Sequence, residues 1–171
     1  MPRMEFVPRN PRHPRFGGRQ APEPLPKRRN AYPAPWAGRG MDTETATALP
    51  RSAVSVQVTL RGHTVVQDKP VASGGRDEGP MASELLLAAL LGCQNSTFVK
   101  VAAKRRVAAT LRRLDGEMDF KDGDISALRV RFTLATDATD DQVATVLRLT
   151  DKACTISQAL KVPVEATFTR A

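Results

Sequence analysis

One stretch of the sequence constrains the fold more than any other. Residues 85–105 are almost all helix-compatible, and as far as Gln94 they are apolar on nearly every side of a helix. A helix that is hydrophobic all round must be buried. At about 1.5 Å per residue it spans more than roughly 30 Å, enough to cross a small domain. We expect Ser83 as its N-cap, and no membrane span, because the apolar run 85–91 is far shorter than the roughly 18–20 residues required.

Strands are expected on both sides of this helix. Residues 52–60 alternate apolar and polar side chains, which is the period-two pattern of a half-buried strand, and a short strand follows at His63–Gln67. Beyond the helix, strands over 110–120 and 125–136 are joined by Lys-Asp-Gly-Asp, a sequence typical of a hairpin turn.

A second helix and a closing strand complete the pattern. The sequence Thr-Asp-Asp-Gln at 139–142 matches a capping box, and the apolar residues after it keep to one helical face as far as Cys154. An alternating strand over 162–168 follows. This order predicts an α+β domain with a long buried central helix wrapped by antiparallel strands. So few strands cannot cover the helix on all sides, so we expect an intertwined homodimer.

The first forty residues differ in composition from the rest of the chain. They hold nine Lys or Arg, two acidic residues and nine of the 13 prolines, whereas residues 41–171 hold 17 basic and 16 acidic residues. Prolines at this density prevent regular helices and strands. We therefore expect residues 1–50 to be a disordered tail and residues 51–171 to form the domain. A basic arm can bind nucleic acid through phosphate charge. A solvated leader is the simpler interpretation, so nucleic acid is not the expected partner.

Location and metal content follow from what the sequence lacks. The N-terminus has no apolar segment of the kind found in secretory signals, so the cytoplasm is the expected location. Two cysteines 61 residues apart, without a CxxC motif, argue against a zinc site or a secreted disulfide framework. No metal is expected.

The two cysteines allow two interpretations. Cys93 ends the apolar run and is followed at once by polar residues, and Cys154 lies near the end of the second helix. Cysteine is among the most buried residue types, so both can be core side chains. If the two helices pack together, the thiols can instead meet and run a peroxidatic cycle: one thiolate attacks a peroxide, and the other captures the sulfenic acid as a disulfide.

Each cysteine lies in a segment with a distinctive pattern. The first is DKPVASGGRDEGPMASELLLAALLGC, in which an Asp-x-Pro, a Gly-Gly loop and a Gly-Pro precede a leucine-rich run that ends at Cys93. The second is LTDKACTISQALKVPVEATF, which contains Cys154. Together they resemble the two cysteine segments of the OsmC/Ohr family, at about the expected distance, and the resemblance covers residues 54–168. It implies an OsmC-like fold, formed by an intertwined homodimer with active sites at the subunit interface.

The resemblance also implies an activity. The family's peroxidase branches reduce organic hydroperoxides in oxidative stress defence with a cysteine pair, without haem, flavin or metal, and draw electrons from a lipoyl-type dithiol. By match of motif, Cys93 is the peroxidatic thiol and Cys154 the resolving thiol. The alternative is a non-enzymatic member that keeps the scaffold as a binding or sulfur-handling module.

Three charged residues are candidates to assist Cys93. The peroxidase branches use an arginine, held by a glutamate, because an unassisted thiol with a pKa near about 8.5 is mostly protonated at neutral pH. Glu84 is the candidate acid, although the family's acid aligns with Ser83, which is about 100° away around a helix. Arg61 and Arg76 are the candidate cations, and for each a surface charge is the alternative.

Overall fold

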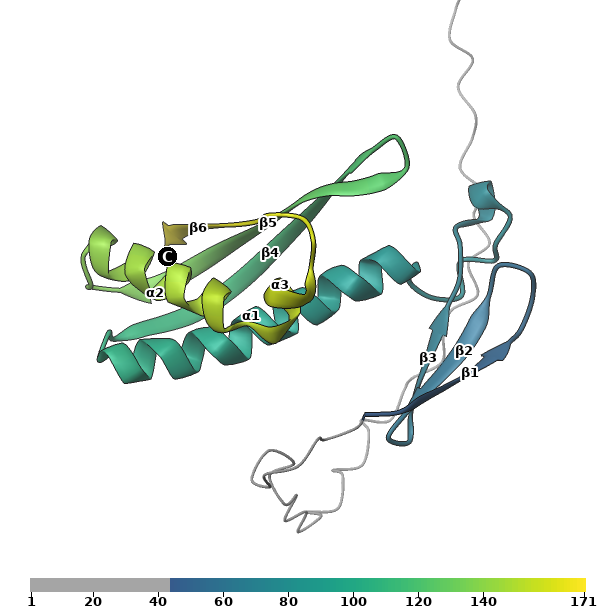
Figure 1. Cartoon of the computed structure of the whole chain (residues 1–171), viewed down its shortest axis with the longest axis horizontal. Helices are drawn as coiled ribbons and strands as arrows, with labels where there is room; N and C mark the ends of the chain where they lie inside the picture. Colours follow the sequence, from purple (N-terminus) through teal and green to yellow (C-terminus); the bar gives the residue numbers. More distant parts are fainter. Residues whose placement is uncertain (1–43) are drawn as a thin grey trace, which may run out of the picture. The chain divides into compact units, whose positions relative to one another are not determined.

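The structure is a computed structural model of the chain, and it describes residues 44–171 (Figure 1). The expected disorder of the first fifty residues concerns a segment that lies almost entirely outside this range. The described unit, Glu44–Ala171, is α+β as expected, with two three-stranded sheets and a long central helix.

The first sheet is antiparallel and has the order β1-β2-β3, formed by Ala46–Pro50, Val56–Leu60 and His63–Gln67. Strand β1 was not expected, because its residues fall in the segment that composition assigned to the tail; the folded unit therefore begins before residue 51. Strands β2 and β3 are joined by a tight turn in which Arg61 and Gly62 have φ of 48° and 82°. Two consecutive residues with positive φ are what a two-residue hairpin turn requires.

The loop after β3 is organised by a buried carboxylate. The side chain of Asp68 accepts hydrogen bonds from the backbone N–H groups of Lys69 at 2.8 Å, Arg76 at 2.9 Å and Glu78 at 3.3 Å. The loop also contains one 3-10 turn, η1 (Val71–Ser73). Its chain path requires glycine at residue 75, where a Cβ atom would lie 1.8 Å from the Lys69 carbonyl oxygen.

Helix α1 runs from Ala82 to Arg105. Its N-cap is Met81, and the expected cap, Ser83, instead lies within the first turn. The reason is the carboxylate of Glu84, which accepts a hydrogen bond from the Met81 N–H at 2.7 Å and so fixes the helix start there. Its C-cap is Arg106, which has a φ of 56° in the left-handed region.

The second sheet has the order β4-β5-β6, formed by Ala109–Lys121, Asp124–Thr136 and Val164–Arg170. The predicted hairpin between β4 and β5 is confirmed, with positive φ at Asp122 and Gly123. Strand β6 pairs with β5 in parallel, in contrast to the other strand pairs of residues 44–171. Parallel pairing needs a crossover connection, which the two helices between these strands provide.

Those two helices are α2 (Asp140–Ala153) and the short α3 (Thr155–Ala159). The predicted capping box of α2 is confirmed: the Gln142 N–H donates to the Thr139 hydroxyl at 3.3 Å, and the Thr139 N–H donates to the Gln142 amide oxygen at 2.9 Å. Helices α1 and α2 contact each other, and they pack against β4 and β6 respectively (Figure 1).

The core lies between these two helices and the second sheet. Alternate residues of β5 are fully buried there, as the period-two pattern predicted, and among them Phe132 packs against Phe98 of α1 with ring centroids 5.4 Å apart. The buried residues of α1 recur every fourth position and form one stripe along the helix: Leu90, Gln94, Phe98 and Ala102.

The rest of the surface of α1 is less covered than the sequence predicted. Val99 is 57% exposed, and Ala88, Ala89 and Gly92 on the same side are exposed as well. By length and mean hydropathy alone, the whole of α1 could cross a membrane. The expectation of no membrane span rested only on the apolar run 85–91, which is too short to cross one. Core helices of globular folds share that property, and the buried stripe identifies α1 as one of them.

Candidate active site

The fold brings the two cysteines together. Cys93 lies midway along α1 and Cys154 follows α2, and their Sγ atoms are 2.8 Å apart although 61 residues separate them in the chain. Both are free thiols; Cys154 is fully buried and Cys93 is half-buried. The arrangement places a sheltered thiol directly behind one that solvent reaches.

The spacing of the apolar residues predicted that Cys154 lies on the inward face of the second helix. This prediction is wrong, because α2 ends at Ala153. Cys154 occupies the break between two helices, as the C-cap of α2 and the N-cap of α3, with extended backbone angles (φ −77°, ψ 113°). Its Sγ accepts a hydrogen bond from the backbone N–H of Ser157 at 3.5 Å. A cap position lets the side chain turn away from both helices, and here it points to Cys93.

Neutral donors lower the pKa of the Cys93 thiol. Burial raises this pKa, but hydrogen bonds outweigh that effect, the strongest being from the Cys154 thiol. The backbone N–H groups of Thr155 and Ile156 and the Thr97 hydroxyl, whose oxygen is 4.0 Å from Sγ, add to the same effect. These donors stabilise a thiolate at Cys93, and the thiolate is the nucleophilic form of cysteine.

The pKa of Cys154 moves in the opposite direction. Burial raises it, and so does the hydrogen bond in which the Cys154 thiol donates to Cys93. The side-chain hydroxyl and the backbone N–H of Ser157 both lower this pKa, but they do not cancel these effects. The two thiols therefore have different roles available: Cys93 is the acceptor that ionises first, and Cys154 is the donor that keeps its proton.

A buried polar pair lies beside the thiols. The side-chain amide of Gln94, the residue after Cys93, donates to the Ser157 hydroxyl at 2.8 Å, and the Gln94 side chain is fully buried. Its amide oxygen is also buried and has no hydrogen-bond partner. Neither residue was among the candidates that the sequence indicated. The signal available was a glutamine directly after the cysteine of an apolar run.

The three charged candidates are exposed, and their observed contacts are with residues other than Cys93. The Glu84 carboxylate is exposed and bonds the Met81 N–H at the start of α1. Arg61 is exposed in the β2–β3 turn, and Arg76 is exposed in the loop, 3.8 Å from Glu78. Within residues 44–171, no hydrogen bond or ion pair joins these side chains to Cys93, so their proposed roles remain predictions.

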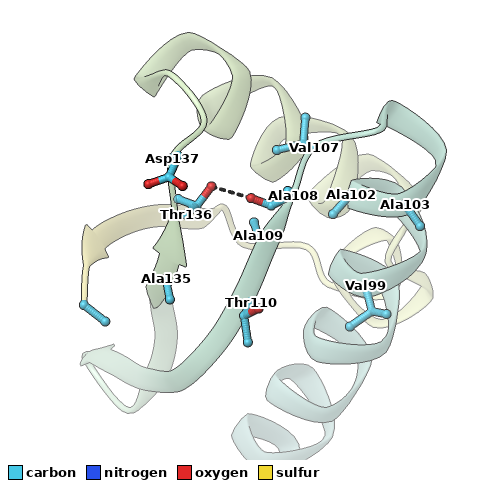
Figure 2. Close-up of a pocket in the computed structure, with 11 residues that line it drawn as sticks. Val99, Ala102, Ala103, Val107, Ala108, Ala109, Thr110, Ala135, Thr136 and Asp137 are labelled. Carbon is cyan, nitrogen blue, oxygen red and sulfur yellow. Dashed lines mark hydrogen bonds between the residues drawn. The ribbon is translucent and has the colours of Figure 1, made fainter.

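Neither a metal cluster nor a nearby cavity among residues 44–171 competes with the thiol pair as a site. Residues 44–171 contain no group of three or more His, Cys, Asp or Glu side chains that could hold a metal ion. A cavity of about 770 Å³ lies beside the C-terminal part of α1. Val99 and Ala103 of the helix line one side of it, and Thr110 and Ala135 of the sheet line the other (Figure 2). Its lining offers no thiol, so it provides no alternative nucleophile of that kind.

Comparison with known families identifies this arrangement. The family described as OsmC-like protein matches residues 75–169, a segment that includes both cysteines and more than half of the chain. This chain belongs to the OsmC-like family. The resemblance seen in the two cysteine segments is thereby confirmed. No curated protein matches the chain.

Solved structures of OsmC-like proteins share the fold at low sequence identity. An OsmC-like protein from Mycoplasma pneumoniae is 12% identical, with a TM-score of 0.66 over 77% of this chain and 99% of its own. An organic hydroperoxide resistance protein from Elizabethkingia anophelis is 15% identical, with a TM-score of 0.62 over 78% of this chain and all of its own. The corresponding protein OsmC from Legionella pneumophila is 16% identical, with a TM-score of 0.55 over 78% and 99%. At these identities the likeness shows the fold alone.

Proposed function

We propose that this OsmC-like protein is a thiol-dependent peroxidase that reduces organic hydroperoxides. The observation that carries the proposal is the Sγ–Sγ distance of 2.8 Å between a half-buried thiol with a lowered pKa and a buried thiol with a raised one. Such a pair supplies both a nucleophile and a resolving group without any metal or organic cofactor. The fold shared with organic hydroperoxide resistance proteins supports the same choice of substrate class.

The proposed cycle has three steps. The Cys93 thiolate attacks the terminal oxygen of R–O–OH; the O–O bond breaks, the sulfur is oxidised to a sulfenic acid, and the alkoxide takes up a proton and leaves as an alcohol. The Cys154 thiol then attacks the Cys93 sulfur, and its proton leaves with the hydroxyl group as water, which forms the disulfide. An external dithiol of the lipoyl type reduces the disulfide by two thiol–disulfide exchanges and becomes a cyclic disulfide.

The uncovered side of α1 supports a homodimeric form of this enzyme. Val99 and the small exposed residues beside it make an apolar strip on a helix that otherwise belongs to the core. A second copy of the chain would bury that strip, as expected for an intertwined dimer. We place the enzyme in the cytoplasm, where reducing conditions keep a cysteine pair in its thiol form between turnovers.

One assay tests the proposed function. The reduced full-length protein is mixed with an organic hydroperoxide and a lipoyl-type dithiol, and hydroperoxide loss is compared with that of Cys93→Ser and Cys154→Ser. We expect loss with the wild type, none above background with Cys93→Ser, and arrest after one turnover with Cys154→Ser. Persistent turnover in Cys93→Ser would refute the mechanism.

A binding or sulfur-handling module is the second candidate. The observation that favours it is the neutral character of the donors around Cys93, because a guanidinium that could orient a peroxide is not among them. In the assay above, this candidate predicts that the wild type consumes no hydroperoxide although both thiols react with thiol reagents.

A further inference from the structure

We propose that the buried hydrogen bond between Gln94 and Ser157 is a positioning clamp, which holds the turn between α2 and α3 against α1 and keeps the Cys154 thiol aimed at Cys93. The inference rests on the proposed thiol cycle and deepens it, because it assigns the residues that control the resolving step. Neither residue touches the substrate in this proposal, so both are positioning residues.

The contacts form a continuous link between the two cysteine segments. Gln94 follows Cys93 directly on α1, and its amide reaches across to the Ser157 hydroxyl at 2.8 Å. The backbone N–H of Ser157 in turn donates to the Cys154 sulfur at 3.5 Å. One residue therefore bonds both to the helix that carries the first thiol and to the second thiol itself.

The Gln94–Ser157 bond in this link does not depend on the redox state of the sulfurs. The hydrogen bond between the thiols exists only while Cys154 keeps its proton and Cys93 can accept it. Once Cys93 becomes a sulfenic acid, that bond is lost, and the turn must stay in place until Cys154 attacks. The Gln94–Ser157 bond contains no sulfur, so oxidation of Cys93 leaves it intact.

Stability alone does not account for Gln94. Its side chain is fully buried, yet its amide oxygen has no partner, and a buried acceptor without a hydrogen bond is destabilising. Replacing both partners of a buried hydrogen bond with apolar groups of similar shape is often neutral or stabilising. Apolar side chains at positions 94 and 157 together would therefore serve stability about as well. The polar side chain therefore points to a role in holding Ser157.

The test uses a reaction that does not require peroxidase activity. Reduced full-length protein is mixed with dithiodipyridine: Cys93 forms a mixed disulfide and releases one thiopyridone, and Cys154 then displaces the second as it closes the Cys93–Cys154 disulfide. The first-order rate of the second release reports how well Cys154 is aimed. We expect Gln94→Leu and Ser157→Ala each to slow this closure by about tenfold or more, as small misplacements of reacting groups do.

Further variants separate positioning from general destabilisation. The double variant is expected to close no more slowly than the slower single variant, because both remove one bond. Ser157→Thr keeps the hydroxyl and is expected to restore most of the rate. Thr150→Val is the matched control: Thr150 is fully buried on α2 and donates to the Val146 carbonyl at 2.8 Å, but does not bond α1. It is expected to leave the closure rate unchanged.

The outcomes distinguish this inference from the proposed function. Closure at the wild-type rate in folded Gln94→Leu, or in Ser157→Ala, overturns the clamp. Slowing by Thr150→Val as large as that by Ser157→Ala overturns it too, since any loss of stability would then produce the effect. If the wild type closes quickly and the clamp variants close slowly, but no organic hydroperoxide is consumed, the clamp stands and the peroxidase proposal falls.

Discussion

Oxidation of the cysteine pair should stabilise the fold by an amount that the chain itself sets. A Cys93–Cys154 disulfide closes a loop between residues 61 positions apart, and the loss of chain entropy in the unfolded state then corresponds to about 4 kcal/mol of added stability. Little of this should be lost to strain, because the sulfur atoms already lie 2.8 Å apart and need to approach by less than about 1 Å.

The same figure sets how strongly folding favours the disulfide. Linkage requires that the bond and the fold stabilise each other equally, so about 4 kcal/mol means that folding favours disulfide closure by roughly a thousandfold. A pair that folding brings together by chance, with poor alignment, would gain far less. The difference in stability between the oxidised and reduced forms therefore measures how well the two thiols are placed for bonding.

Urea denaturation of the oxidised and reduced forms, at matched protein concentration, measures this difference. We expect the oxidised wild type to unfold at a higher urea midpoint and the Cys154→Ser variant to show no difference between oxidising and reducing conditions. An oxidised protein with a verified intrachain bond that is no more stable than the reduced form would refute the reasoning. It would mean that forming the bond distorts the fold by as much as the cross-link stabilises it.

Three further predictions follow from individual contacts. Cys154→Ala should raise the pKa of Cys93, since it removes the strongest donor to that sulfur; thiolate absorbance against pH measures it, and an unchanged curve would contradict the assignment. Burial raises the pKa of the Asp68 carboxyl, but backbone N–H donors outweigh that effect and lower it below its ordinary value. Its stabilising contribution is therefore present above about pH 4 and lost as pH falls further, so unfolding midpoints of Asp68→Asn should depend less on pH in that range than those of the wild type. Val99→Asp should dissociate the proposed dimer, whereas Val71→Asp, at an even more exposed site, should not; sedimentation at equal concentrations decides, and identical masses for both would count against the α1 interface.

Much of the fold could be predicted from the sequence, because its signals are local. The hairpin turn at Asp122 and Gly123 needs two residues with positive φ, and Asp-Gly is a sequence that supplies them. The capping box at Thr139 and Gln142 is likewise complete within four residues. The predicted N-cap of α1, Ser83, was wrong: the helix has Met81 as its N-cap. Methionine is not a typical capping residue, and the Glu84 carboxylate fixes the helix start by accepting a hydrogen bond from the Met81 N–H.

The site could be predicted only in part, because its decisive contacts are between distant residues. Cysteine spacing left open whether the thiols meet, and the family resemblance supplied that expectation. The break between α2 and α3, at which Cys154 lies, could not be predicted, because the residues around it are all compatible with a continuous helix. The bond from Gln94 to Ser157 spans 63 positions and could not be inferred from either residue alone.

If Cys93 and Cys154 act together as one redox unit, a single oxidation must consume both thiols. The reduced full-length protein is treated with a single equivalent of an organic hydroperoxide, the remaining thiols are blocked, and proteolytic peptides are mapped by mass. We expect loss of both thiols and a Cys93–Cys154 bond within one chain. Retention of both thiols, a Cys93 sulfenic acid that persists beside a free Cys154, or disulfides only between chains would contradict it.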